Sequence, residues 1–339
     1  MKLIPVDNAV GMVLGHDITE IVPGRFKGPA FKRGHVIRHE DVNRLRDLGK
    51  ENIAALDLGP GWVHEDDAAY RLAIAAAGEG ITLSSPSEGK VNLIASCDGL
   101  LKINVDRLNG VNTISEVMMA TLHTNQLVKD GQIVAGTRII PLIIKYETIQ
   151  AAEAQCMPND PVVSIRPVMP HLVGLITTGG EVYHKRIEDQ FGPVVKKKIS
   201  SLGSRILRQI YVPDDISTTV ASIEAIIGEG AQIVLITGGM SVDPDDLTPG
   251  SIRATGAEVI TYGAPVLPGA MFMLAYLEGI PIIGLPGCVM YHETSIFDLV
   301  LPRILAGERL TREDFIALGH GGMCMGCNDC RYPACGFGK

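Results

Sequence analysis

Residues 231–249 read AQIVLITGGMSVDPDDLTP, an apolar run that meets a glycine pair and then a cluster of acids. The apolar run over residues 233–236 stops abruptly before Gly238 and Gly239. A buried strand that ends in glycines lets a ligand approach the backbone closely, because no Cβ is in the way. Successive N–H groups in such a turn can bind an anion. The turn therefore predicts a site for a small molecule that carries a phosphate.

Polar side chains that suit such a ligand follow the glycine pair. The hydroxyl of Ser241 comes first. Three carboxylates come next: Asp243, Asp245 and Asp246. Clustered carboxylates suit a divalent cation that shares the charge of a bound phosphate. Glycine turns are common in α/β folds, and it is the added Ser241 and Asp246 that favour a function here. Asp243 and Asp245 can equally be solvated acids of a loop.

Strand and helix patterns alternate from residue 171 onward. Apolar runs predict strands at residues 172–176, 205–212, 233–236 and 280–285. Four-residue apolar steps predict helices at residues 186–202, 216–227 and 291–305. This alternation predicts an α/β fold, with a parallel or mixed sheet and helices on both faces. Ligands bind at the carboxyl ends of strands in such sheets, so the glycine turns after three of these strands predict one composite pocket.

Composition divides the chain into four parts. Residues 1–84 mix helix and strand signals as an α+β segment, and residues 85–160 are β-rich, with an Asp-Gly hairpin signal at residues 98–99. Prolines mark a domain boundary: Pro158, Pro161, Pro167 and Pro170. The α/β domain is expected at residues 168–310, and a cysteine-rich tail takes residues 311–339.

Charge and hydropathy narrow the class of partner. The 339 residues carry a formal net charge of −8, which argues against a broad nucleic-acid surface. The N-terminus lacks a signal-peptide pattern, and no apolar run approaches the length of a membrane span. We therefore expect a cytoplasmic protein that binds neither nucleic acid nor a membrane.

Four of the seven cysteines crowd the last residues of the chain in the pattern C-x2-C-x2-C-x4-C: Cys324, Cys327, Cys330 and Cys335. This crowding argues against a disulfide framework and for a local metal site. A zinc ion with four thiolate ligands fits, and so does an iron–sulfur cluster, to which we give a slight preference. Four free surface thiols are the plain alternative.

Five short segments of the α/β region carry a family resemblance. They are Thr178-Gly179-Gly180-Glu181-Val182, Thr237-Gly238-Gly239-Met240-Ser241-Val242, Asp246-Leu247-Thr248-Pro249, Val266-Leu267-Pro268-Gly269 and Gly284-Leu285-Pro286-Gly287. In this order and spacing, residues 171–310 resemble the molybdopterin-binding domain shared by molybdopterin adenylyltransferases and molybdopterin molybdenumtransferases.

The resemblance implies a role for each position. Gly238, Gly239 and Ser241 would hold the terminal phosphate of molybdopterin, and Asp246, as the catalytic residue, would bind Mg²⁺ or orient the reacting group. The remaining residues of the implied binding set are Thr178, Gly179, Glu181, Thr237, Asp243, Pro268, Gly269, Pro286, Gly287 and Cys288. The family also implies a homo-oligomer.

Departures from the family pattern leave several functions open. Gly180 replaces an aspartate, Cys288-Val289 replaces Asn-Pro, and Gly250 replaces an acid. Mg²⁺-dependent transfer of molybdate to molybdopterin is the leading hypothesis, and the Asp-Leu-Thr-Pro segment favours adenylyl transfer instead. The lost acids favour a non-catalytic module that binds or senses the cofactor. In that case the tail thiolates could signal to a partner; they could also hand molybdenum or sulfur to the pterin. A nucleotide-processing relative on the same fold is a further alternative.

Overall fold

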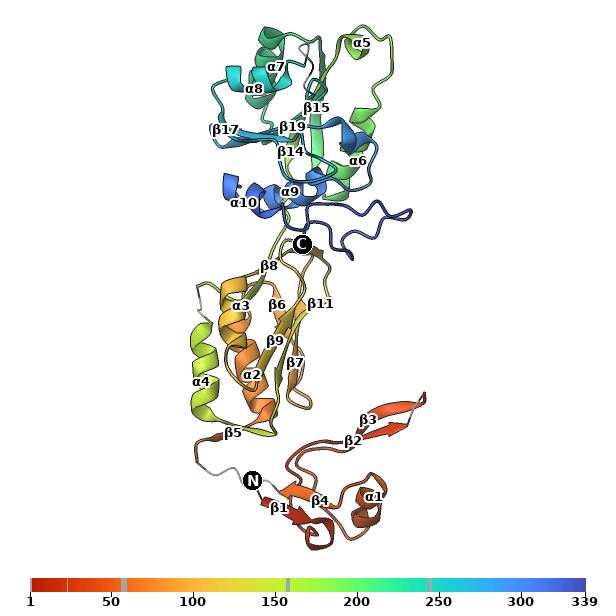
Figure 1. Ribbon diagram of the computed structural model, residues 1–339, viewed down its shortest axis with the longest axis vertical. Helices are drawn as coiled ribbons and strands as arrows, with labels where there is room; N and C mark the ends of the chain where they lie inside the picture. Colours follow the sequence, from red (N-terminus) through yellow and green to blue (C-terminus); the bar gives the residue numbers. More distant parts are fainter. Residues whose placement is uncertain (1, 23, 56–59, 157–158, 242, 244–245) are drawn as a thin grey trace. The chain divides into compact units, whose positions relative to one another are not determined.

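The computed structural model of the protein describes residues 2–22, 24–55, 60–156, 159–241, 243 and 246–339 (Figure 1). The chain forms two compact units. The first contains residues up to 165, and the second contains residues 166–339 together with the short segments 98–100 and 125–127. Three residues named above, Pro158, Val242 and Asp245, lie outside the described residues.

Small sheets and short helices make up the chain as far as residue 166. The elements are β1 (Lys2–Pro5), η1 (Val6–Asn8), β2 (Ile18–Val22), β3 (Phe26–Phe31), α1 (Asp41–Asp47), β4 (Asn52–Ala55), β5 (Trp62–His64), α2 (Glu65–Ala76), β6 (Ile81–Leu83), β7 (Lys90–Ala95), β8 (Gly99–Ile103), α3 (Val105–Asn112), β9 (Val117–Thr121), β10 (Leu127–Val128), β11 (Ile133–Ile139), β12 (Ile143–Lys145), α4 (Tyr146–Gln155) and β13 (Val163–Arg166). A four-stranded sheet in the order β6-β7-β11-β9 packs against α2, which buries Leu72 among Val91 and Leu93.

The hairpin predicted at residues 98–99 is wrong. β7 pairs with β6 and β11, whereas β8 lies between β10 and β13 in another sheet. β8 buries the successive residues Gly99, Leu100 and Leu101. A strand buried on both faces needs cover on both, unlike the half-exposed strands of a hairpin.

The second unit holds the predicted α/β domain. Its elements are β14 (Leu172–Thr178), α5 (Gly180–Tyr183), α6 (Phe191–Ser201), β15 (Arg205–Val212), α7 (Ile216–Gly228), β16 (Ile233–Thr237), α8 (Thr248–Ala254), β17 (Glu258–Tyr262), β18 (Met273–Leu277), β19 (Ile280–Leu285), η2 (Gly287–Met290), α9 (Ile296–Leu305) and α10 (Arg312–Ala317). One six-stranded sheet runs in the order β15-β14-β16-β19-β18-β17. The first four strands are parallel, and β18 and β17 are antiparallel to their neighbours.

Helices cover both faces of this sheet (Figure 1). Alternate residues of each strand enter different cores, so Leu175 packs with α6, α9 and α10, and Ile176 packs with α7 and α8. The first core includes Val195, Phe297 and Phe315 from those three helices. The predicted α/β fold, with a mixed sheet and helices on both faces, is confirmed.

Two helices begin later than their apolar patterns predict. The helix expected from residue 186 begins at Phe191, and Ile187, which extends its apolar stripe, is 56% exposed in the preceding loop. The helix expected from residue 291 begins at Ile296, because Ser295 and Asp298 form a capping box there. None of the helices in the described ranges combines the length and the apolar character that crossing a bilayer requires.

Candidate functional site

The ends of three strands meet at one edge of the six-stranded sheet. Thr177 of β14 is in register with Thr237 of β16, and Thr237 is in register with Leu285 of β19. The three strands are parallel, so the turns that follow them all leave from the same edge. The glycine turns that the sequence singles out are thus neighbours in space.

Buried hydroxyl groups tie these turns together. Thr248, at the start of α8, donates from Oγ1 to the carbonyl oxygen of Gly238 at 2.8 Å, and its backbone N–H donates to the carbonyl oxygen of Gly239 at 3.2 Å. Thr178 donates from Oγ1 to the carbonyl oxygen of Thr237 at 3.3 Å. The side chains of Thr178, Thr237 and Thr248 are all buried. This network fixes the direction in which the Gly238-Gly239 turn points.

The glycine pair is required by the packing of the turn itself. Gly238 has a φ of +89° and Gly239 a φ of +59°, which both lie in the left-handed region. A Cβ on Gly238 would lie 2.4 Å from the carbonyl oxygen of Thr178, and one on Gly239 would lie 2.7 Å from Oγ1 of Thr248. The absence of Cβ atoms at these two glycines therefore allows neighbouring turns to pack closely. This packing keeps the backbone of the Gly238-Gly239 turn near the strand ends.

The acids that follow the turn lie in a tight loop. The N–H of Asp246 donates to the carbonyl oxygen of Asp243 at 2.9 Å, which holds the two residues in one turn. Asp246 is half-buried, whereas Ser241 and Asp243 are exposed. Within the described ranges, no three His, Cys, Asp or Glu side chains are placed to hold a metal ion. Asp243 and Asp246 are the carboxylates of this loop that lie in the described ranges.

A cavity of about 710 Å³ lies beside the strand edge, between residues 182–189 and Tyr211. Its lining includes the basic side chains of Lys185 and Arg186 and the carboxylate of Asp189. Gln209 connects this lining to the strands, because its Nε2 donates to Oδ2 of Asp189 at 2.6 Å and to Oγ1 of Thr177 at 2.9 Å. The cavity is large enough for an aromatic ring system.

Burial and the nearby Asp189 carboxylate raise the pKa of the Tyr211 hydroxyl, which belongs to the lining of this cavity. The hydroxyl of Tyr211 therefore stays protonated and able to donate a hydrogen bond. It donates to Oδ2 of Asp189 at 3.4 Å.

The predicted residues of β14 and α5 lie at this edge. Gly179 is buried with a φ of +134°, and its position precedes the single-turn helix α5. Glu181 is exposed on that helix, and no ion pair found in the described part of the chain joins it to Lys185 or Arg186. Asp214 takes part as well, because its Oδ2 accepts a hydrogen bond from the N–H of Gly180 at 2.9 Å.

The loop after β19 joins the same edge. Pro286 is buried and Gly287 is exposed at the start of η2. Cys288 is half-buried, and burial raises the pKa of its thiol. A thiol with a raised pKa stays protonated and is a poor nucleophile, so Cys288 contributes shape to the loop.

The segment Pro268-Gly269 is held against a different element. The carbonyl oxygen of Pro268 accepts a hydrogen bond from the N–H of Ile296 at 3.2 Å. A Cβ on Gly269 would lie 2.4 Å from Cγ2 of Ile296, so this glycine lets the segment pack on the start of α9. None of the hydrogen bonds seen among the described residues links it to the Gly238-Gly239 turn.

Thr248 and Asp214 are the structural residues of the site that sequence reasoning missed. Thr248 stands in the Asp-Leu-Thr-Pro segment, where a threonine before proline is a helix-start signal that could have placed its hydroxyl near the turn. No local pattern marks Asp214, because it acts on Gly180, which lies 34 residues away in the chain.

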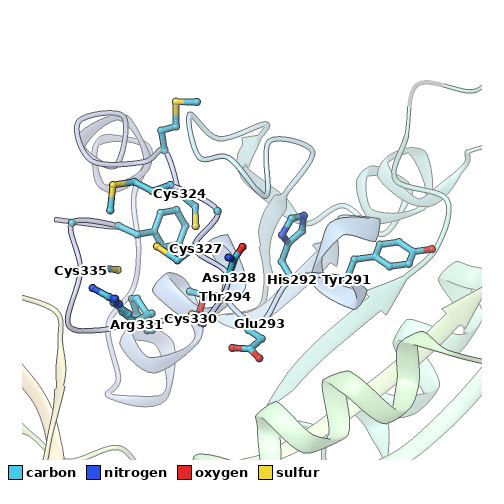
Figure 2. A pocket seen from close by; sticks show the side chains of 16 residues that line it. Tyr291, His292, Glu293, Thr294, Cys324, Cys327, Asn328, Cys330, Arg331 and Cys335 are labelled. Carbon is cyan, nitrogen blue, oxygen red and sulfur yellow. Dashed lines mark hydrogen bonds between the residues drawn. The ribbon is translucent and has the colours of Figure 1, made fainter.

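The four tail cysteines gather elsewhere in the same unit. Cys324, Cys327, Cys330 and Cys335 all line one cavity of about 410 Å³, beside the segment that carries Tyr291 and His292 (Figure 2).

Comparison with known proteins identifies the α/β region. A family model described as "Probable molybdopterin binding domain" matches residues 174–306, and a model described as a domain of unknown function (DUF8806) matches residues 3–57. The molybdopterin molybdenumtransferase of Synechococcus elongatus is 26% identical over 148 residues, which cover 41% of this chain and 34% of that protein. The molybdopterin adenylyltransferase of Pyrococcus furiosus is 31% identical over 90 residues, which cover 26% of this chain and 53% of that protein.

The solved structure of the tungsten cofactor synthesizing protein MoaB from Pyrococcus furiosus aligns with a TM-score of 0.34 and 19% identity, over 42% of this chain and 98% of that chain. The chain spans between 26% and 53% of the length of the curated relatives that match it first. Residues 174–306 therefore match the model of a probable molybdopterin-binding domain, as the sequence resemblance predicted.

Proposed function

We propose that the edge formed by the ends of β14, β16 and β19 binds molybdopterin by its terminal phosphate. The observation that supports this most is the parallel register of the strands, which brings the three glycine turns side by side. Backbone N–H groups of Gly238 and Gly239 and the hydroxyl of Ser241 supply neutral donors for the phosphate. The exposed hydroxyl of Ser241 is free to turn toward such a ligand. The adjoining 710 Å³ cavity, with Lys185 and Arg186 in its lining, takes the pterin rings.

Mg²⁺ fits this edge as a second ligand. Mg²⁺ in proteins is usually bound by one or two carboxylates together with phosphates of the substrate. Asp243 and Asp246 offer two carboxylates from one turn. When bound, the ion would neutralise charge that builds up on the phosphate and on an incoming oxyanion. Asp246, which is half-buried beside the start of α8, then orients the reacting group.

The reaction that fits this arrangement is Mg²⁺-dependent transfer of molybdate to the pterin dithiolene. The Asp246-Leu247-Thr248-Pro249 segment favours a second candidate, adenylyl transfer to the same phosphate, because Thr248 lies against the turn proposed to hold it. A cytoplasmic location and assembly into a homo-oligomer remain predictions.

Binding and turnover measurements on the full chain test this proposal. Ser241→Ala removes a hydrogen bond to a charged group, worth about 1.5–3 kcal/mol, so we expect molybdopterin to bind roughly 10- to 100-fold more weakly. Ser222→Ala in the middle of α7 is the matched control and leaves affinity unchanged. Adding Mg²⁺ with molybdate, or Mg²⁺ with ATP, then separates the two reactions by their products.

A chain that binds molybdopterin normally but shows no turnover with either addition would be a binding or sensing module. Equal molybdopterin affinity in the Ser241→Ala and wild-type chains would contradict the proposed phosphate site.

A further inference from the structure

The cysteine-lined cavity is a preformed hollow in the second unit. Cys324, Cys327, Cys330 and Cys335 line it, and its volume is about 410 Å³ (Figure 2). Cys327 and Cys330 are exposed, whereas Cys324 and Cys335 are half-buried. Free thiols on a surface loop would not need to line one cavity together. The arrangement of the four cysteines around the same cavity therefore indicates a common ligand.

The two ends of the tail are fixed to the domain core. The N–H of Cys324 donates to the carbonyl oxygen of Leu267 at 2.8 Å, and the N–H of Leu267 donates to the carbonyl oxygen of Gly322 at 2.8 Å. At the other end Phe337 is 4% exposed in the core that α6, α9 and α10 share. The tail therefore holds Cys324 and Cys335 in place without any ligand, and only the loop between them is left to adapt.

The residues that precede α9 form a second wall of the cavity. Oγ1 of Thr294 lies 3.3 Å from Sγ of Cys330. Nζ of Lys198 donates to the carbonyl oxygen of Glu293 at 2.6 Å and to Oδ1 of Asp298 at 2.5 Å. Lys198 is thus fixed against the residues at the start of α9. Hydrogen bonds to the rest of the unit thus fix this wall of the cavity, as they fix the start of the cysteine segment at Cys324.

The arrangement of the four cysteines indicates which metal group can occupy the cavity. A single zinc ion requires sulfur atoms that converge to about 2.3 Å from one point. No three ligating side chains in the described residues converge in that way, although all four cysteines line the cavity. An iron–sulfur cluster places several atoms between the cysteine sulfurs, so it suits thiols that are spread around a hollow. Hydrogen bonds to the sulfurs are a normal means of tuning such clusters, and the hydroxyl of Thr294 is placed to donate one to a Cys330 thiolate.

We propose that Cys324, Cys327, Cys330 and Cys335 bind a [4Fe–4S] cluster in this cavity. Each thiol releases its proton to solvent as its sulfur binds one iron, because a thiolate is the ligand. The cluster enters by exchange with the small thiols that carry it, so no electron transfer is involved in binding. This site is separate from the proposed molybdopterin edge, and its occupancy is measured without any pterin.

Anaerobic incubation of the full chain with ferric iron, sulfide and a small thiol tests the proposal. The small thiol reduces two of every four ferric ions as it is oxidised to its disulfide, and it carries the assembled cluster before the exchange. We expect about four iron and about four sulfide per chain, with a broad visible absorption that bleaches on reduction. Cys327→Ser and Cys330→Ser change exposed loop residues, so both variants keep the fold and lose most of the cluster. Cys97→Ser, at a half-buried cysteine of the first unit, is the matched control and retains the full iron content.

Three outcomes would overturn the proposal. One is a wild-type chain that takes up a single zinc ion tightly and no iron with sulfide. Another is a wild-type chain that binds neither zinc nor iron. The third is a Cys327→Ser, Cys330→Ser double variant with a normal thermal melting curve that keeps the wild-type iron and sulfide content. Because pterin takes no part in the assay, none of these outcomes depends on the function proposed for residues 174–306.

Discussion

Replacing Thr248 by valine tests whether its hydroxyl sets the shape of the Gly238-Gly239 turn. The side chain is 2% exposed, and its Oγ1 donates to the carbonyl oxygen of Gly238 at 2.8 Å. Valine keeps the volume but leaves that carbonyl without its donor, which costs about 1–3 kcal/mol of unfolding free energy. Serine keeps the hydroxyl and loses one methyl group, which costs about 1 kcal/mol.

The two variants should differ more in ligand binding than in stability. We expect Thr248→Val to weaken molybdopterin binding about tenfold, the equivalent of about 1.4 kcal/mol, and Thr248→Ser to bind normally. Thr137→Val is the matched control, since Thr137 is also buried and donates from Oγ1 to the carbonyl oxygen of Ala69 in the first unit at 3.2 Å. The Thr137→Val variant should have a lower unfolding free energy and an unchanged affinity for molybdopterin. Denaturant unfolding and equilibrium titration measure both quantities, and a Thr248→Val chain with wild-type affinity would refute the reasoning.

Three further predictions concern single side chains. Asp246→Asn should abolish turnover and leave the melting temperature unchanged, and a variant that retains wild-type turnover would remove Asp246 from the catalytic role. Burial raises the pKa of Glu65 from 4.5 to about 7, so its ionisation destabilises the folded state as pH rises through that range. Glu65→Gln should therefore gain stability over wild type between pH 4.5 and about 7 and hold that gain above it, and parallel stability curves would contradict this. Phe337→Ala should lower the unfolding free energy by about 3–5 kcal/mol, because it empties a site in the core, and an unchanged denaturation midpoint would show that the tail is not anchored there.

The sequence was sufficient to predict the centre of the sheet. β16 and β19 are short, continuous apolar runs bounded by glycine and proline, and parallel strands buried on both faces have that signature. β17 was not predicted, because Val259 is 37% exposed on an edge strand and the segment has no continuous apolar run. Edge strands bury little, so their patterns are weak.

The candidate site shows a similar limit. The glycine turns could be located because each follows a strong strand signal, and the parallel order then made them neighbours. The contacts that hold the turns, from Thr248 to Gly238 and from Asp214 to Gly180, join residues that no local periodicity relates. The late start of α6 has the same cause, because Asp189 accepts hydrogen bonds from the N–H groups of Phe191 and Gly192 and so ends the preceding loop. Tertiary partners decide such boundaries, and apolar spacing does not report them.

The two proposed sites are connected by one short segment, residues 286–298. It begins at the buried Pro286 beside the strand edge, passes Thr294 at the cysteine cavity, and ends in the capping box of Ser295 and Asp298. Lys198 holds the later part of this segment, because its Nζ donates to the carbonyl oxygen of Glu293 and to Oδ1 of Asp298. Any effect of the cluster on molybdopterin affinity must then be matched by an equal effect of molybdopterin on cluster affinity, since coupling between two binding equilibria is reciprocal. Cluster affinity measured with and without bound pterin, and pterin affinity measured with and without the cluster, should therefore give the same coupling free energy.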